Sequence, residues 1–161
     1  MRIQFTDPSK SFDHDDETLK EGILNLIRKA RNSVSIHGFY LSGFYEEEMF
    51  DLVLIEAIRR GVKLNVYGGK ESHVRKIFNV FSMHKPLCYY WNNISENKRA
   101  EYHLKAIIVD DLYVYLGSAN LTRNGLENSA EVGLIFENNY VCQQIERYAK
   151  HLVDEGFFVR L

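Results

Sequence analysis

Features that divide a chain into domains, or hold it at a membrane, are scarce in this sequence. The 161 residues include only two prolines, Pro8 and Pro86, and no Gly/Ser-rich or low-complexity segment. We therefore expect one domain over residues 1–161. No run of eighteen apolar residues occurs, which argues against a transmembrane helix. The first residues lack the apolar segment of a signal peptide.

An excess of positive charge is also missing. Lysine and arginine number 20, aspartate and glutamate 22, and the net charge is −2. This balance argues against one large basic face for nucleic acid and against a polybasic membrane module, although a local basic groove stays open. Cysteine is rare too. Cys88 and Cys142 have no metal-ligand spacing, and we expect two free, mostly buried thiols in a cytoplasmic protein, with a disulfide less favoured.

What the chain does contain is an alternation of strand and helix patterns. A strand at 33–41, a helix at 45–60 ended by Gly61, and a strand at 62–67 predict parallel pairing with a right-handed crossover. A mixed β-sheet with helices on both faces, an α/β fold, follows. The other expected elements are an edge strand near the N-terminus, helices at about 16–32, 70–81 and 140–154, strands at 87–91, 130–136 and 156–161, and a loop at 121–129.

Polar residues gather on one hairpin in the stretch HLKAIIVDDLYVYLGSAN (103–120). If the first arm is a strand, His103 and Lys105 leave the same face of the sheet. The pair Asp110-Asp111 supplies turn residues. The second arm ends in small polar residues beside the start of the first. One cluster is thus expected to hold His103, Lys105, Gly117, Ser118 and Asn120.

This combination suits displacement at a phosphodiester. The Lys105 ammonium is a point charge for phosphate. Ser118, Asn120 and the backbone N–H groups near Gly117 can surround the phosphoryl oxygens. An unperturbed imidazole titrates near physiological pH, so a histidine such as His103 can serve as nucleophile or as general acid and base. A buried hairpin with an incidental His and Lys is the less favoured interpretation, because polar residues on an apolar strand face need a reason.

The order His-x-Lys, four residues, Asp, six residues, Gly-Ser-x-Asn resembles the signature of the phospholipase D superfamily. It is complete here, with Asp110 as the aspartate. The resemblance implies a sheet covered by helices, no metal or other cofactor, and a two-step reaction. One histidine attacks phosphorus and forms a phosphohistidine. A second histidine, from a second motif copy, protonates the leaving oxygen and then activates water.

The sequence holds only one copy of the motif. A complete site therefore predicts a homodimer that brings His103 and Lys105 of two chains onto one phosphate. The small single-motif bacterial endonucleases of the superfamily are organised in this way, and the chain resembles them in length and copy number. DNA or RNA is the favoured substrate.

Further residues receive roles beside the motif. We expect Asp110 to support the hairpin, and Glu131 to orient His103, as the resemblance implies and as in other histidine-based sites. Lys98 and Arg99 are candidate contacts to a phosphate backbone. Tyr89, Tyr90, Trp91 and Tyr102 could stack bases, but a core position is the favoured reading. His37 is expected to be a core histidine.

Two other functions stay open from the sequence. One is a lipid phosphodiesterase of the phospholipase D type that works at a membrane surface. The other is a non-catalytic nucleic-acid-binding or dimerisation subunit of a larger system. The intact motif argues against the second.

Overall fold

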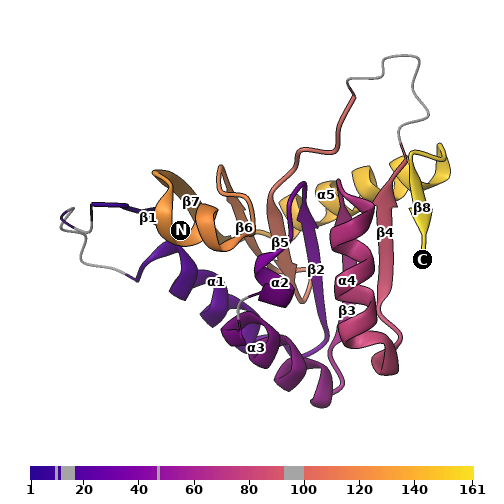
Figure 1. Cartoon of the computed structure of the whole chain (residues 1–161), viewed down its shortest axis with the longest axis horizontal. Coiled ribbons are helices and arrows are strands. Elements are labelled where there is room, and N and C mark those ends of the chain that lie inside the picture. The colour runs from indigo at the N-terminus through magenta and orange to yellow at the C-terminus, as the bar shows by residue number, and fades with distance from the viewer. Residues whose placement is uncertain (10, 12–16, 47, 93–99) are drawn as a thin grey trace.

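A computed structural model describes residues 1–9, 11, 17–46, 48–92 and 100–161 of the chain. Eight strands form one sheet in the order β1-β7-β6-β5-β2-β3-β4-β8 (Figure 1). The predicted mixed α/β sheet is confirmed. The strands are β1 (Arg2–Thr6), β2 (Ser33–Gly38), β3 (Lys63–Gly68), β4 (Leu87–Trp91), β5 (Ala106–Val109), β6 (Tyr113–Gly117), β7 (Glu131–Glu137) and β8 (Phe158–Arg160).

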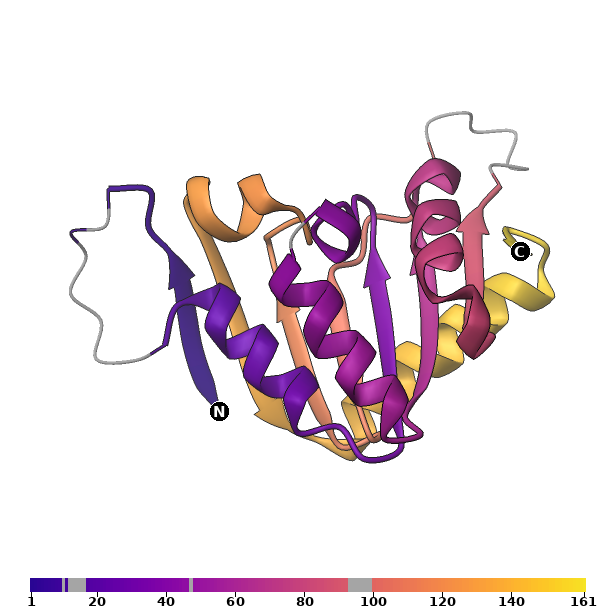
Figure 2. The same ribbon diagram turned by 60° about the horizontal axis from the view of Figure 1, so that its bottom comes forward.

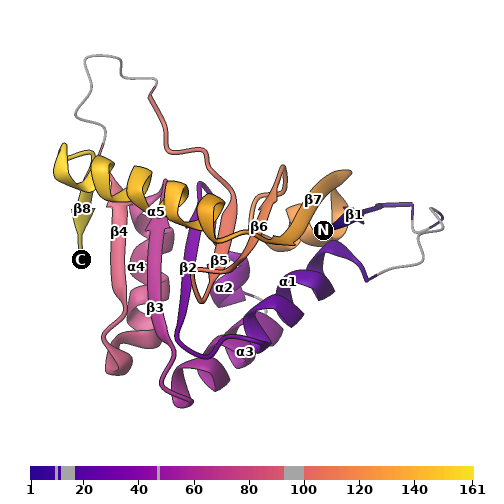
Figure 3. The same cartoon turned by 180° about the vertical axis from the view of Figure 1, so that it is seen from behind.

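Helices cover both faces of the sheet, as predicted. The helices α1, α3 and α4 lie on one face, with the short α2 among them near the C-terminal end of β2 (Figure 2), and α5 crosses the other face (Figure 3). The helical segments are α1 (Leu19–Arg28), α2 (Gly43–Glu46), α3 (Glu48–Arg59), α4 (Glu71–Phe81), η1 (Ser82–His84), η2 (Asn124–Asn128) and α5 (Asn139–Asp154).

The hairpin β5–β6 lies at the centre of the sheet. β2 pairs in parallel with β3, as the strand–helix–strand pattern predicts, and β3 also pairs in parallel with β4. The hairpin runs antiparallel to both of its neighbours, β2 and β7. One end of the sheet therefore gathers the C-terminal ends of β2, β3 and β6 and the N-terminal ends of β5 and β7. We call this end the motif edge, because the residues around His103 and Asn120 lie there.

Alternate residues of the hairpin fill two cores. Ile107, Val109 and Tyr115 pack with α1 and α3, whereas Ile108 and Val114 pack against α5. The expected free, buried thiols are confirmed: Cys88 and Cys142 belong to opposite cores, and burial raises their thiol pKa values to about 12 and about 11. Such thiols are protonated and unreactive at neutral pH.

Three predicted elements differ from the structure. The first helix ends at Arg28 rather than near Asn32, because the backbone N–H groups of residues 31–33 donate to the Asp110 carboxylate instead. The helix expected at 45–60 is two helices. The first begins earlier, at Gly43, whose N–H donates to the carbonyl of Leu121 at 2.9 Å.

The third difference is the segment 121–129, which contains the π-helical turn η2 instead of a plain loop. Leu121 and Leu126 are both buried, so the segment must fold back onto the core. The hydroxyl of Thr122 accepts the N–H of Gly125 at 3.2 Å and starts the turn.

Candidate active site

His103 and Lys105 lie in the segment that leads into β5, three residues and one residue before the sheet ladder begins at Ala106. His103 is exposed, whereas only 7% of Lys105 is exposed. Lys105 Nζ lies 2.8 Å from His103 Nδ1 and donates to the carbonyl of His103 at 3.0 Å. The two side chains therefore share one side of the chain, as the spacing predicts. Burial lowers the pKa of Lys105, and the Glu131 carboxylate partly offsets this.

The two ends of the hairpin meet beside this pair. The N–H of Gly117 donates to the carbonyl of Lys105 at 3.3 Å. Glycine is required at 117, because a Cβ atom would lie 2.3 Å from the hydroxyl oxygen of Tyr115. The phenol of Tyr115 is fully buried and covers Gly133 as well, where a Cβ would lie 2.5 Å from its ring. The Tyr115 side chain thus packs directly against Gly117 and Gly133 at the end of the motif, a contact that sequence reasoning missed.

Ser118 joins the motif to the start of β7. Its N–H donates to the carbonyl of Val132 at 3.0 Å, and the N–H of Val132 donates to Ser118 Oγ at 3.2 Å. The Ser118 hydroxyl also donates to the Glu131 carboxylate. The structure therefore brings Glu131 to Ser118, whereas the ring of His103 contacts Lys105. The expected direct contact between Glu131 and His103 is absent from these described residues.

The side-chain oxygen of Asn120 has no hydrogen-bond partner among the described residues. Its backbone is held by Gly125, where a Cβ atom would lie 2.3 Å from the Asn120 carbonyl oxygen. The unpaired oxygen, Oδ1, is buried. A buried amide without a partner costs free energy, about 1–3 kcal/mol, unless a ligand or water completes it. The unpaired oxygen therefore lowers the stability of the chain at the end of the motif.

Asp110 lies far from these groups along the hairpin, at its turn. Its carboxylate accepts the backbone N–H groups of Arg31 at 2.9 Å, Asn32 at 2.7 Å and Ser33 at 2.9 Å. Burial raises its pKa, but these bonds together outweigh burial and hold the pKa below its ordinary value. Asp110 and Asp111 both have a positive φ, near 55°, which suits a tight hairpin turn. Asp110 thus ties the hairpin to the end of α1.

The aromatic residues considered for base stacking pack against the hydrophobic cores. Tyr102 is 3% exposed and stacks on Trp91, and Trp91 stacks on Phe157. His37 is fully buried, with its Nδ1 2.8 Å from the Tyr102 hydroxyl. The expected core position is confirmed for Tyr102 and His37, whereas Tyr89, Tyr90 and Trp91 are half-buried and pack against the cores. Lys98 and Arg99, the expected phosphate contacts, lie outside the described residues.

The Gly68-Gly69 turn serves packing next to His103. The N–H of Gly69 donates to the carbonyl of Gly38 at 2.9 Å. A Cβ at Gly69 would lie 2.4 Å from the ring of Phe39. Phe39 in turn packs against the His103 ring, with centroids 5.1 Å apart. The glycine therefore makes room for an aromatic neighbour of His103 that sequence reasoning did not identify.

The described residues contain neither a metal-binding cluster nor a helix that could span a membrane. Among the residues that the structure describes, no group of three or more His, Cys, Asp or Glu residues is close enough to bind a metal ion. Within that same part of the chain, no helix is both long and apolar enough to cross a membrane.

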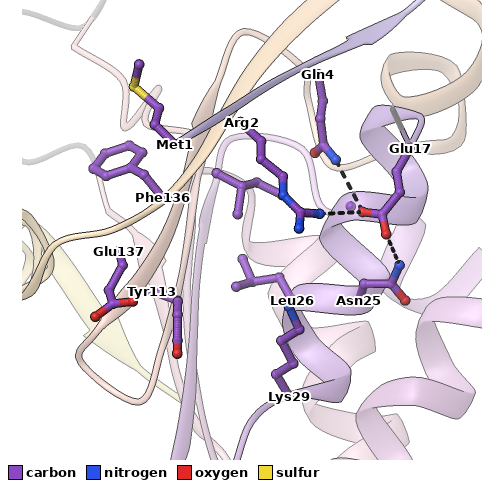
Figure 4. A pocket seen from close by; sticks show the side chains of 12 residues that line it. Met1, Arg2, Gln4, Glu17, Asn25, Leu26, Lys29, Tyr113, Phe136 and Glu137 are labelled. Carbon is purple, nitrogen blue, oxygen red and sulfur yellow. Dashed lines mark hydrogen bonds and ion pairs between the residues drawn. The ribbon is translucent and has the colours of Figure 1, made fainter. Parts of the chain in front are cut away.

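A cavity of about 200 Å³ lies away from the motif edge, between α1 and the opposite ends of β1 and β7. Figure 4 shows Arg2, Gln4 and Asn25 pointing toward Glu17 in this cavity. Asn25 Nδ2 donates to Glu17 at 2.8 Å, and Arg2 pairs with it at 3.7 Å. These contacts hold the edge strand β1 to α1, so the polar side chains of this cavity serve the packing of the fold.

Comparison with known proteins agrees with the motif. Residues 23–153 match the model of a family described as cardiolipin synthase, PLD-like domain. The chain belongs to the phospholipase D-like family. The DISARM protein DrmC of Bacillus paralicheniformis is 26% identical over 144 residues, which cover 86% of this chain and 58% of DrmC. The chain thus spans little more than half the length of this curated relative.

Two solved structures show the same fold. Nuc from Salmonella typhimurium, a phospholipase D family member, has a TM-score of 0.71 and 15% identity, and the match covers 99% of this chain and 96% of Nuc. Phosphatidylserine synthase from Haemophilus influenzae has a TM-score of 0.74 and 17% identity, and the match covers 99% of this chain but 39% of that one. At these identities the likeness establishes the fold alone.

Proposed function

We propose that this phospholipase D-like chain is a metal-independent phosphodiesterase that cleaves DNA or RNA. The observation that carries the proposal is the contact of the buried Lys105 ammonium with the exposed His103 imidazole, at the meeting point of the two hairpin ends. A nucleophile and a cation for the phosphoryl group thus lie side by side. Ser118 and Asn120 follow the second arm of the hairpin, whose last residue, Gly117, is hydrogen bonded to Lys105.

The first step forms a bond between a His103 ring nitrogen and phosphorus while the bond from phosphorus to the leaving sugar oxygen breaks. That leaving oxygen takes a proton from His103 of a second copy of the chain. In the second step the same second histidine removes a proton from water, and the water oxygen displaces His103 from phosphorus. No group besides the two histidines and water is needed to balance the protons.

Lys105 changes partners in this scheme. In the free protein its ammonium donates toward Nδ1 of His103. A phosphate oxygen is a stronger acceptor for an ammonium than a neutral ring nitrogen is. Substrate therefore draws Lys105 away, stabilises the developing charge on phosphorus, and leaves Nδ1 able to hold the ring proton while the other nitrogen attacks.

Glu131 acts in this proposal through Ser118, to which it is hydrogen bonded. Its negative charge also favours the ammonium form of Lys105, as the direction of its effect on the Lys105 pKa shows. Glu131 is therefore a positioning residue. We propose that it keeps the Ser118 hydroxyl in place and Lys105 charged when phosphate arrives.

The likeness to Nuc supports a nucleic-acid substrate. The match to Nuc extends over nearly the whole of both chains, whereas phosphatidylserine synthase is more than twice as long as the matched region. Because the sequence given has one motif copy, we propose that a homodimer completes the site. A lipid phosphodiesterase is the second candidate, because the family description and one structural neighbour name lipid enzymes.

One assay separates these candidates. Purified protein in excess EDTA is given labelled DNA, RNA and phosphatidylcholine vesicles. We expect cleavage of nucleic acid, and its loss in His103→Ala by orders of magnitude, since a nucleophile works as part of a unit. His84→Ala is the matched control, because His84 is exposed in η1, away from the motif.

Other results would redirect the proposal. Activity that disappears in EDTA and returns with Mg²⁺ would reject the metal-independent mechanism. Cleavage of phosphatidylcholine alone would establish the lipid enzyme. Salt-dependent nucleic-acid binding without cleavage of any substrate would favour the non-catalytic subunit.

A further inference from the structure

A short chain of ring contacts connects His103 with a second exposed ring, that of Tyr40. Phe39 is 6% exposed and packs against the His103 ring at 5.1 Å between centroids. Tyr40 packs edge-on against Phe39 at 4.5 Å. Tyr40 is 39% exposed, which makes it an open aromatic side chain two contacts away from the proposed nucleophile. Both residues directly follow β2, at the motif edge.

A cation accompanies these rings. Lys70 Nζ lies 4.3 Å from the centroid of Phe39 and 5.8 Å from that of Tyr40. Lys70 precedes α4, and its side chain is 40% exposed. It pairs with Glu101 at 3.9 Å, and Glu101 is itself half exposed. Because an ion pair between exposed side chains contributes little free energy, an incoming phosphate can compete for Lys70.

The position of Tyr40 is held from its other side. The Tyr40 ring packs against His73 at 5.6 Å. Nδ1 of His73 accepts the N–H of Leu41 at 3.1 Å, which ties the chain after Tyr40 to α4. The ring is therefore presented by two elements and needs little ordering when a ligand binds, which favours affinity.

A flat, uncharged ring next to an anion-binding cation matches a nucleotide. Every nucleobase can stack on an aromatic ring, and the linked phosphate can pair with lysine. A choline headgroup fits poorly, because its own positive charge would meet Lys70 beside the ring. A base pair inside a duplex is already stacked and does not offer its face. An unpaired base does.

We infer that Tyr40 and Lys70 form a subsite for the nucleotide next to the cleaved phosphate, and that the substrate enters as a single strand. The base stacks on Tyr40, and its phosphate contacts Lys70 while the neighbouring phosphate lies between His103 and Lys105. This inference rests on the proposed function and narrows its substrate class. We call the pair Tyr40 and Lys70 the stacking subsite.

The test measures binding without turnover. In the His103→Ala background, fluorescence anisotropy in EDTA follows a labelled single-stranded oligonucleotide of mixed sequence, its duplex, and vesicles of phosphatidylcholine with an anionic phospholipid. Tyr40→Ala should weaken single-strand binding roughly 5- to 100-fold and leave duplex and vesicle binding unchanged. Tyr40→Phe keeps the ring and should stay within about twofold of the parent.

Lys70 has a different signature. Lys70→Gln should make the slope of log affinity against log salt shallower by about 0.7, the value for one phosphate contact on a single strand, and Lys70→Arg should restore it. The matched controls are Tyr140→Ala, whose ring is 68% exposed at the start of α5, and Lys63→Gln, at the opposite end of β3. Neither control should change single-strand binding.

Several outcomes overturn the stacking subsite. The first is a Tyr40→Ala affinity for the single strand equal to that of the parent, or no oligonucleotide binding by the parent at all. The second is a loss of affinity in Tyr40→Ala that is just as large for the duplex or for vesicles. The third is an equal loss of single-strand affinity in Tyr140→Ala. The cleavage assay fails independently. If Tyr40-dependent binding is found but wild-type protein cleaves nothing, the subsite stands and the enzymatic proposal falls. If wild type cleaves nucleic acid but Tyr40→Ala binds normally, only the subsite falls.

Discussion

At the scale of single residues, Asp110 shows how one side chain can serve a catalytic motif without touching substrate. Its carboxylate accepts three backbone N–H groups where α1 leads into β2. Those donors would otherwise have to find water or stay unpaired. The hairpin that carries Lys105 and Asn120 is therefore anchored at the end opposite the chemistry.

Removal of this carboxylate should lower the free energy of unfolding. Asp110→Ala should cost about 1–3 kcal/mol more than Asp111→Ala, measured by urea denaturation at pH 7. Asp111→Ala is the matched control, because both residues have a positive φ near 55° and both changes place alanine in that strained region. The difference isolates the three hydrogen bonds. Equal losses in the two variants would show that the bonds contribute nothing.

The pH dependence has a definite sign. The Asp110 pKa is lowered in the folded chain, so its contribution is full above the ordinary carboxyl pKa and disappears as pH falls through the folded value. The gap between Asp110→Ala and Asp111→Ala should accordingly shrink below about pH 4. A gap that stays constant into acid would mean that the carboxylate charge is not involved.

At the scale of elements, α5 is attached to the motif edge through a buried polar network. His37 on β2 lies 2.8 Å from the Tyr102 hydroxyl, 3.1 Å from Ser35 Oγ and 3.6 Å from Glu146 of α5. Tyr102 directly precedes His103. The network therefore connects the single helix on that face of the sheet with the segment that presents the proposed nucleophile.

Glu146→Gln should weaken this attachment. Burial raises the Glu146 pKa, but the hydrogen bond and attraction from His37 and a bond from Ser35 outweigh it, and the pKa is lowered overall. The stability that Glu146 contributes is present above its ordinary pKa and is lost as pH falls through the folded value. The melting temperature of Glu146→Gln should thus be lower than that of wild type at pH 7, with convergence below about pH 4.5.

Glu155→Gln, at the exposed end of α5, serves as the control and should melt like wild type throughout. A Glu146→Gln protein that melts like wild type at pH 7, or a difference that grows in acid, would contradict this account of the network.

The elements also show what sequence can and cannot predict. The strand at 87–91 and the hairpin were predictable, because an apolar run between turn residues is a local signal. The π-helical turn at 124–128 was not, because burial of Leu126 and the contact of Gly43 with Leu121 depend on distant segments. The motif predicted Lys105 beside His103. It gave no sign of Tyr115 against Gly133, or of Phe39 beside His103, since those contacts join segments that are distant in the sequence.

At the scale of the whole molecule, one motif per chain leaves the proposed reaction a histidine short. The hypothesis is a homodimer with one composite site, to which each copy contributes His103 and Lys105. After subunit exchange, mixing wild type with His103→Ala should make activity fall as the square of the wild-type fraction, because a mixed dimer keeps one histidine. Mixing with His84→Ala should leave activity unchanged. A linear fall, or an active monomer in analytical ultracentrifugation, would reject the composite site.

The measurement that tests the central claim most directly is the identification of the covalent intermediate. Wild-type protein in EDTA is mixed with a single-stranded oligonucleotide, quenched within the first turnover under conditions that preserve phosphohistidine, and digested for mass spectrometry. We expect a nucleotide joined through its own phosphate to a ring nitrogen of His103. The adduct should be present in no more than half of the chains and absent from His103→Ala. Cleavage with no adduct on His103, or an adduct on another residue, would contradict it.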